Sequence, residues 1–531
     1  MMMKRLKTKI LWQLGMLSCL AISSCSKDIA LGTDPYAGGK ESLGIGFYKS
    51  YSQPGSAKPG ELVDFYVKGI QPYLGKLNFY VNNTKVEVIE ARDSLVTVKV
   101  PAQISSGEAK VEADGQVFYG PRLEIDGNVS RDANYKMVNG FSGMVSDILP
   151  AAGGYLVTGG FINFENEAVE KKVFRNRIHF IDGEGKSSNA IDQIGEGTNG
   201  YISSITKMTD GKFLLAGLFN KFNKKNVFGF ARLNPNGSLD SVIVDVINTT
   251  TNPKDALDTV CTFNAGTTGN VLKVFGLSGN RVIAVGNLDN HFKVDHAYSS
   301  RTNKRPIVTR VKHIMRMKAD GSLDSTYMIN NAGANTIILD AEMIDNERVL
   351  IAGAFTTFNG KPAKGIVCIK ADGTVDPTFS LGGTVDRIFD VSYNAKLKKI
   401  VISGVFKGSG ANGKVNGVAV LNVDGTIDDR FVLGDIGTGL VTFAQMLDNG
   451  RIVVQGTFES YNAVKRSNFL VLESDGTLLQ KYNNQSPFNG SINKIIETKS
   501  SLGAPALFVA GSILQFGGDR VGNFFRMEIK D

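Results

Sequence analysis

Seven short apolar runs that each end in glycine recur along most of this 531-residue chain. A turn rich in Gly, Asp and Asn follows six of them, and the clearest copy spans residues 348–379, with the turn Asp372-Gly373-Thr374. Self-similarity of this kind constrains the architecture more than any single motif does. The glycines lie 51 to 69 residues apart, and they are Gly159, Gly217, Gly286, Gly353, Gly404, Gly456 and Gly511.

Each repeat has the pattern of β-strands. The apolar runs are short, rich in β-branched residues and bounded by Gly, Asn and Asp. An Asp-Gly between two such runs predicts a hairpin, because the turn needs positive φ. Seven units of four strands predict an all-β fold with a seven-bladed β-propeller over residues 132–531. The last unit lacks its fourth strand, so we expect residues 134–138 to supply it and close the ring.

The first 24 residues have the pattern of a secretory leader. Four cations at positions 4, 5, 7 and 9 precede the apolar segment 10–22, which is too short to span a bilayer as a stable helix. Residues 25–43 are polar and glycine-rich, and we expect them to form a tether. Without the leader the formal charge falls from +8 to +4, which excludes a nucleic-acid footprint or a polybasic membrane patch.

Residues 44–126 contain no copy of the repeat. Most of their apolar runs alternate with polar residues, as strands with one buried face do. This segment therefore predicts a separate immunoglobulin-like β-sandwich. The expected strands are 62–68, 76–81, 85–90, 95–100, 109–113 and 116–119.

Three stretches resemble known bacterial families. Ile22-Ser23-Ser24-Cys25 resembles the bacterial lipobox, which implies cleavage before Cys25 and its acylation with lipid such as palmitate; the alternative is an ordinary cleaved signal with an incidental Cys. Lys58-Pro59-Gly60, Val100-Pro101 and Ser106-Gly107 resemble the IPT/TIG immunoglobulin-like domain. The Asp-Gly-Ser-Leu-Asp-like turns resemble those of bacterial delta-sixty repeats.

This combination resembles surface lipoproteins of Bacteroidetes, and Ser26-Lys27-Asp28 is similar to their surface-export signals. The resemblance implies an outer-membrane lipoprotein facing the cell exterior. Its implied partners are a starch-utilisation-type (Sus-like) nutrient importer or neighbouring surface lipoproteins, and its implied ligand is an oligosaccharide or a peptide. Pure scaffolding without a ligand stays open.

Candidate ligand-binding residues come from alignment of the repeats through the marker glycines. The start of the first strand of each blade faces the propeller axis, so polar residues there form either a ligand-binding ring or the hydrated wall of a central channel. The aligned residues are Asp147, Ser204, Asp340, Asp386 and Asn493.

Two groups of residues resemble metal sites, but a structural role is favoured for both. The turn with Asn422, Asp424 and Asp428 lacks the closing bidentate Glu of a calcium loop, so capping of a hairpin is the favoured interpretation. His291 and His296 lie in an enlarged basic loop and have no obvious third zinc ligand. Cys261 and Cys368 could form a disulfide, but nothing in the pattern requires one. No metal or cofactor is predicted.

The sequence favours a non-catalytic function. It contains no Gly-x-Ser-x-Gly elbow, and its one Trp lies in the leader, whereas the sialidase Asp-box needs one. The alternative is a propeller glycoside hydrolase or lyase, which would need two carboxylates that converge on one site.

Overall fold

The computed structural model describes residues 40–328, 331–407 and 417–530. The chain divides into a short unit, Met1–Ile45, and one large unit, Gly46–Asp531, to which the following description applies. The predicted leader and Cys25 lie outside the described residues. Among the residues that are described, no helix has the length and apolarity needed to cross a bilayer.

The N-terminal part of the large unit is a near-closed sandwich of eight strands in the order β1-β3-β6-β5-β4-β7-β8-β2. Phe47, Phe65 and Phe79 pack together in its interior, with ring centroids 4.9 to 6.4 Å apart. Asn82 and Asn83 both have positive φ, as a tight hairpin between β4 and β5 requires. The strands are β1 (Gly46–Gln53), β2 (Ser56–Ala57), β3 (Leu62–Lys68), β4 (Asn78–Val81), β5 (Thr84–Arg92), β6 (Leu95–Lys99), β7 (Gly107–Ala113) and β8 (Gln116–Ile125).

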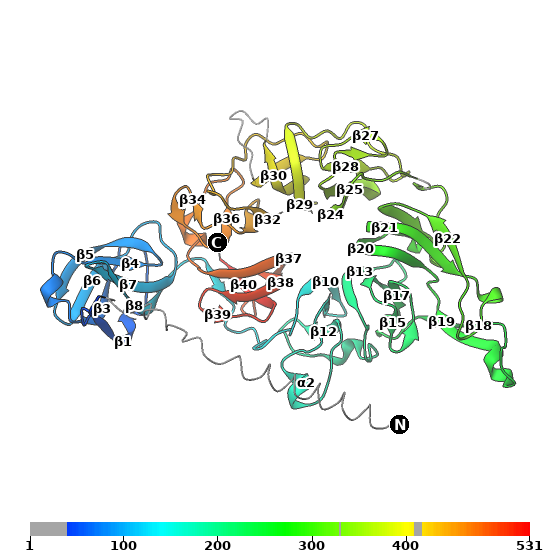
Figure 1. The fold of residues 1–531 in the computed structure, drawn as a ribbon, viewed down its shortest axis with the longest axis horizontal. Coiled ribbons are helices and arrows are strands. Elements are labelled where there is room, and N and C mark those ends of the chain that lie inside the picture. The colour runs from blue at the N-terminus through cyan, green and yellow to red at the C-terminus, as the bar shows by residue number, and fades with distance from the viewer. Residues whose placement is uncertain (1–39, 329–330, 408–416, 531) are drawn as a thin grey trace, which may run out of the picture. The chain divides into compact units, whose positions relative to one another are not determined.

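Seven separate sheets follow and confirm the predicted seven-bladed propeller (Figure 1). In each sheet the first two strands pair antiparallel, and the third strand joins the second. The inner strands of blades 1 to 7 are β10 (Val145–Ala151), β13 (Tyr201–Lys207), β20 (Gly266–Gly276), β24 (Ile338–Ile344), β29 (Thr384–Asn394), β32 (Val441–Met446) and β37 (Phe488–Lys499). The middle strands, in the same order, are β11 (Gly154–Gly159), β14 (Phe213–Leu218), β21 (Val282–Val294), β25 (Arg348–Gly353), β30 (Lys399–Lys407), β33 (Ile452–Gly456) and β38 (Pro505–Phe516). The outer strands are β12 (Ile178–Asp182), β17 (Phe230–Leu233), β23 (Ile314–Met317), β28 (Ile366–Ile369), β31 (Gly417–Asn422), β36 (Phe469–Leu472) and β40 (Phe524–Ile529).

Blade 3 is enlarged. Its middle strand β21 continues beyond the blade and pairs there with β22 (Pro306–Arg310). A separate two-stranded hairpin, β18 (Ser241–Asp245) with β19 (Leu257–Cys261), is inserted between blades 2 and 3. We call this hairpin together with residues 287–312 the blade-3 extension.

The marker glycine of each repeat is required by the close approach of the inner strand. A Cβ on Gly159 would collide with the carbonyl oxygen of Met144, and a Cβ on Gly511 would collide with that of Ser491. Both contacts lie where the inner strand starts a β-bulge. The glycine therefore allows the bulge that recurs in every blade.

The fourth strand predicted for each blade is wrong for blades 1 to 6. After the Asp-Gly-like turn the chain forms a single bridge to the outer strand, such as Leu233 with Leu239, and then leaves the sheet. The last Asp of the turn motif explains this departure. The backbone N–H of Asp324 still bonds to Arg316 O, but its carboxylate binds the Arg316 side chain across the end of the blade.

A strand from before the first blade closes the ring, as predicted, but it is not the predicted segment. The strand that pairs with β40 is β9 (Val129–Arg131), which lies upstream of the predicted closing segment 134–138 and of the predicted propeller boundary at residue 132. Tyr135 and Met137 are buried beside Phe524, so their alternation reflects packing on the blade and not strand pairing.

Asp132 gives the physical reason for this register. Its N–H bonds to Arg526 O, and its carboxylate accepts from Arg526 Nε at 2.7 Å. Tyr135 then lies under the Arg526 guanidinium, as Tyr327 lies under that of Arg316. Residues 132–135 thus repeat the Asp-x-x-aromatic segment of blades 3 to 5, Asp324 to Tyr327 being one example.

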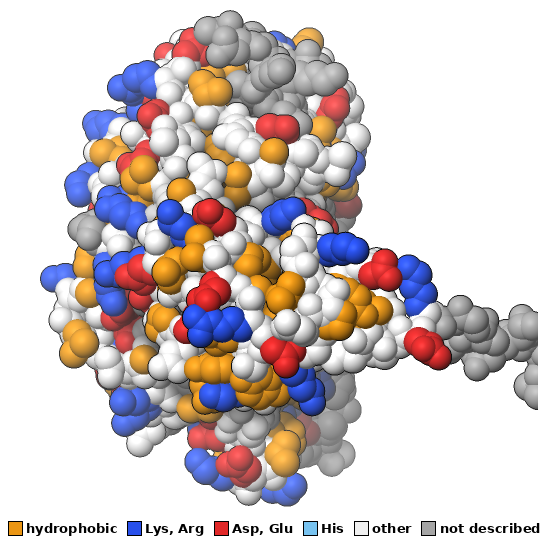
Figure 2. All heavy atoms as spheres, turned by 90° about the vertical axis from the view of Figure 1, so that its left-hand side faces the viewer, with side chains coloured by type: hydrophobic (Ala, Val, Ile, Leu, Met, Phe, Trp, Pro, Cys, Tyr) orange, Lys and Arg blue, Asp and Glu red, His pale blue; other side chains and the backbone are white. Residues whose placement is uncertain are grey.

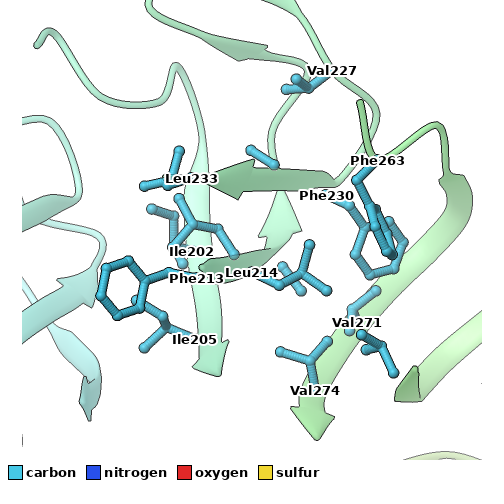
Figure 3. Packing of buried hydrophobic residues seen from close by; sticks show 14 of the residues in the cluster. Ile202, Ile205, Phe213, Leu214, Val227, Phe230, Leu233, Phe263, Val271 and Val274 are labelled. Carbon is cyan, nitrogen blue, oxygen red and sulfur yellow. The ribbon is translucent and has the colours of Figure 1, made fainter. Parts of the chain in front are cut away.

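The blades pack through apolar side chains between neighbouring sheets. Figure 3 shows Ile202 and Leu214 of blade 2 near Val271 and Val274 of the blade 3 inner strand. All four are fully or almost fully buried, which is where most of the folding free energy of such a ring originates.

Candidate functional site

The bulge on each inner strand presents one side chain at an equivalent place in every blade. This place follows the register shift opposite the marker glycine, and Figure 1 shows the inner strands arranged around the middle of the ring. The residues at this bulge position, from blade 1 to blade 7, are Asp147, Ser204, Lys273, Asp340, Asp390, Phe443 and Lys494.

Three of the five predicted ligand-binding residues occupy this position, and two do not. Asp147, Ser204 and Asp340 are placed as the repeat alignment predicted. Asp386 is exposed and lies four residues before the true blade 5 equivalent, Asp390. β29 contains two register shifts. Asp386 lies at the earlier one, between Val385 and Arg387, whereas the marker glycine Gly404 lies opposite Ile388 and so marks the later one.

Asn493 is the bulged residue itself and precedes the blade 7 equivalent. Its side-chain amide donates to the carbonyl of Val145 in blade 1 at 2.9 Å. Lys494 takes the bulge position instead. Cations occupy the bulge position in blades 3 and 7, Lys273 and Lys494, and the repeat alignment did not predict them.

Four of the bulge-position side chains bond the neighbouring blade. Asp147 Oδ2 accepts from the backbone N–H of Ile205, and Asp340 Oδ2 accepts from that of Val391, both at 3.0 Å. Asp390 and Ser204 accept from the next blade in the same way. These groups therefore link the inner strands of neighbouring blades by hydrogen bonds, a role that the sequence did not predict.

Six charged side chains from five blades interact around the same place; we call them the axial charge cluster. Lys273 Nζ lies 3.2 Å from Asp340 Oδ1. Burial alone would lower the pKa of Lys273, but the surrounding carboxylates raise it. The cluster consists of Asp147, Lys273, Asp340, Glu342, Asp390 and Lys494.

Two carboxyl groups of this cluster are hard to ionise. Burial raises the pKa of Glu342, and Asp340 adds to this effect while Lys494 and Lys273 oppose it. Burial and the charge on Asp340 hold the pKa of Asp390 well above its usual value. Among the described residues, Glu342 is the cluster carboxyl for which no hydrogen bond to a neighbouring strand is found. It is thus the acidic group best placed to bind a ligand.

The turn carboxylates are occupied by their own blade. Asp424 Oδ1 accepts from the N–H and the hydroxyl of Thr426, and Asp428 bonds to Lys399 and Arg430. These bonds match the capping role predicted for the turn. In the described part of the chain no group of three or more His, Cys, Asp or Glu has a metal-binding arrangement.

The enlarged basic loop does not bring its histidines together. His291 Nε2 lies 2.9 Å from the carbonyl of Gly321, whereas His296 Nε2 lies 3.2 Å from the amide of Asn264. Cys261 and Cys368 are both buried free thiols, so they form no disulfide.

Exposed aromatic side chains gather on the sandwich. Tyr48 and Tyr51 are about half exposed, at 46% and 52%, and both meet the ring of Tyr66 edge-on at 5.9 Å. Lys49 Nζ lies 3.6 Å from the Tyr66 centroid. Figure 2 shows apolar side chains between charged ones on the face that carries the sandwich. Exposed rings of this kind suit a sugar face or a cationic group.

Comparison with known families matches two parts of the chain. Residues 21–121 match a domain of unknown function, DUF5008, and residues 209–241 and 346–379 match the β-propeller domain of unknown function DUF5122. The second match confirms the propeller repeat. The first covers the sandwich, so membership of the IPT/TIG family stays a prediction.

Solved structures with similar folds are distant. YCF48 from Cyanidioschyzon merolae is 13% identical with a TM-score of 0.37, over 76% of this chain and 99% of that one. An auxiliary nutrient binding protein from Bacteroides thetaiotaomicron is 12% identical with a TM-score of 0.21, over 71% and 97%. A second, from Bacteroides ovatus, is 10% identical with a TM-score of 0.19, over 66% and 94%. No curated protein matches the sequence.

Proposed function

We propose that this chain is a non-catalytic binding protein, held on the outer face of the outer membrane by a lipidated Cys25. It acts as an accessory of a Sus-like nutrient importer and presents the axial charge cluster to an oligosaccharide or peptide. The lipobox resemblance supports the location, and the rigid ring of seven blades supports the role as a platform.

The observation that supports the binding role is that only some side chains of the axial charge cluster are used in bonds between blades. Asp147, Asp340 and Asp390 each accept a backbone N–H from the next blade, so they maintain the ring. Glu342 and Lys494 add an acidic and a basic group beside them. A site with both charges suits a ligand that carries both, such as a peptide, whereas the exposed tyrosines of the sandwich suit an oligosaccharide.

The alternative of a propeller glycoside hydrolase or lyase has one observation in its favour. Glu342 has a raised pKa among neighbouring carboxylates, as a general acid would. Release of reducing ends or unsaturated products from a panel of oligosaccharides would establish this alternative in place of the binding role.

Calorimetric titration of the mature chain against peptide and oligosaccharide panels tests the binding role. For whichever ligand binds, Glu342→Gln is expected to weaken affinity about tenfold, or about 1.4 kcal/mol. The control Asp386→Asn removes an exposed carboxylate from the inner strand of blade 5 and should leave affinity unchanged.

Stability of the Glu342→Gln variant provides an independent check. Because folding raises the pKa of the Glu342 carboxyl, this group stabilises the native state fully at pH values below its pKa in the unfolded chain. That stabilisation is lost as pH rises through its pKa in the folded protein. The substitution should therefore stabilise the protein at neutral pH and have little effect in acid. Equal affinity of Glu342→Gln and wild type for every ligand would refute the assignment of the axial charge cluster as the binding site.

Lipidation is tested at its residue. Cys25→Ser is expected to abolish incorporation of radiolabelled palmitate and to move the protein from the membrane fraction to the soluble fraction, because two or more acyl chains are needed for firm anchoring. Cys261→Ser is the matched control, since that thiol is buried in the propeller. Unchanged labelling of Cys25→Ser would contradict the anchor.

A further inference from the structure

We propose that a cavity between blade 2 and the blade-3 extension is a second binding site, for a small organic anion with an apolar body. The cavity has a volume of about 130 Å³. It is separate from the axial charge cluster, because none of the six cluster residues lines it. Its lining includes Lys225, Val227, Phe230, Phe263, His296 and Lys304.

The walls of the cavity are held by contacts within the blade-3 extension. Lys304 forms an ion pair with Asp258 of β19, and Arg301 forms one with Asp255 just before β19. The backbone N–H of Ile247 donates to Ser299 O at 2.8 Å. The hairpin and the loop that carries His296 are thus fixed to each other, so the cavity does not depend on a free loop.

The floor of the cavity is apolar core. Val227, Phe230 and Phe263 are buried, and Figure 3 shows the last two side by side between blades 2 and 3. Their ring centroids lie 6.1 Å apart. A dry cavity of about 150 Å³ is large enough for benzene, so this cavity has room for roughly one ring.

One hydrogen-bond donor in the wall has no acceptor. Asn264 Oδ1 accepts from Val294 N, which fixes the amide so that Nδ2 donates to Val294 O and to His296 Nε2. Burial, together with Lys304, lowers the pKa of His296, so the ring is neutral and its proton lies on Nδ1. Nδ1 is buried and has no hydrogen-bond partner within the described residues.

The charge of the lining favours an anion as the missing acceptor. Four cations line the cavity against one carboxylate, that of Asp258. Three of the cations have carboxylate partners, and Lys225 has none among the residues described. A buried donor without an acceptor costs free energy, so a ligand oxygen that accepts from Nδ1 gains that amount on binding. The best ligand therefore has a carboxylate and a single ring or branched chain.

Calorimetry with three matched probes tests this site. Phenylacetate is expected to bind at least about tenfold more tightly than its neutral amide, phenylacetamide, and phenethylamine is expected not to bind. His296→Leu and Lys225→Gln should each weaken phenylacetate binding several-fold. Lys221→Gln, which removes an exposed lysine from the neighbouring strand β15 (Lys221–Phe222) outside the lining, should have no effect.

The controls separate this site from the axial charge cluster and from loss of folding. Lys225 is exposed, so its substitution leaves the core intact even if His296→Leu fails to fold. Glu342→Gln should bind phenylacetate like the wild type. Absence of phenylacetate binding, equal binding of the acid and its amide, or equal binding by Lys225→Gln and wild type would each overturn the proposal.

Discussion

Asp132→Ala is expected to destabilise the propeller by about 3–5 kcal/mol, the loss typical when one partner of a buried ion pair is removed. The Asp132 carboxylate and the Arg526 guanidinium lie 2.7 Å apart, with side chains only 1% and 3% exposed. Without Asp132 the guanidinium keeps its charge in the interior of the closing blade. Urea denaturation of the mature chain measures the loss as a shift of the transition midpoint.

Two comparisons show whether the loss arises from ring closure. Asp372→Ala removes a turn carboxylate with a 61% exposed side chain and should cost little. Deletion of the chain up to residue 125 retains β9 and Asp132, whereas deletion up to residue 133 removes both and should give a chain that unfolds without a cooperative transition. Equal stability of the two truncated chains would show that β9 does not close the ring.

Lys273→Met is expected to cost roughly 3 kcal/mol, by the same argument applied to the axial charge cluster. Lys273 is ion-paired with Asp340 and lies within the field of Asp147, Glu342 and Asp390. The pKa of Lys273 is raised on folding, so its contribution to the stability of the folded protein is fully present below its unfolded pKa of about 10.5. That contribution is lost only as pH rises through the higher pKa of the folded protein. At neutral pH the variant therefore shows the full loss.

Acid should restore part of this loss. Without the lysine, the carboxyls whose pKa values are already raised, Glu342 and Asp390, bind protons more readily, so the variant should gain stability as pH falls from neutral toward 4.5. The double variant Lys273→Met/Asp340→Asn should recover most of the stability at neutral pH, and Lys318→Met, at an exposed lysine, is the control. If the double variant is no more stable than Lys273→Met, repulsion among the carboxylates is not the cause.

The repeat alignment predicted the candidate site in part. Asp147, Ser204 and Asp340 follow the first bulge of their strands, and counting from the marker glycine found them. The alignment failed at Asp386 because β29 contains two register shifts and Asp386 lies at the one away from the marker glycine. It failed at Asn493 because this residue is the bulged one, and its amide bonds to Val145 of blade 1. The cavity beside His296 was not predictable, since its walls come from segments with no counterpart in the repeat.

The sequence by itself determined that this chain forms seven β units, because glycine must lie opposite each inner-strand bulge and an Asp-Gly-like turn must follow the outer strand. It also indicated that a segment before the first unit closes the ring. Only the tertiary structure decided that Val129–Arg131 is that segment, since the choice depends on Asp132 reaching Arg526, almost 400 residues away. It likewise decided which charges meet at the axis, because charges from five blades interact only once the ring has closed.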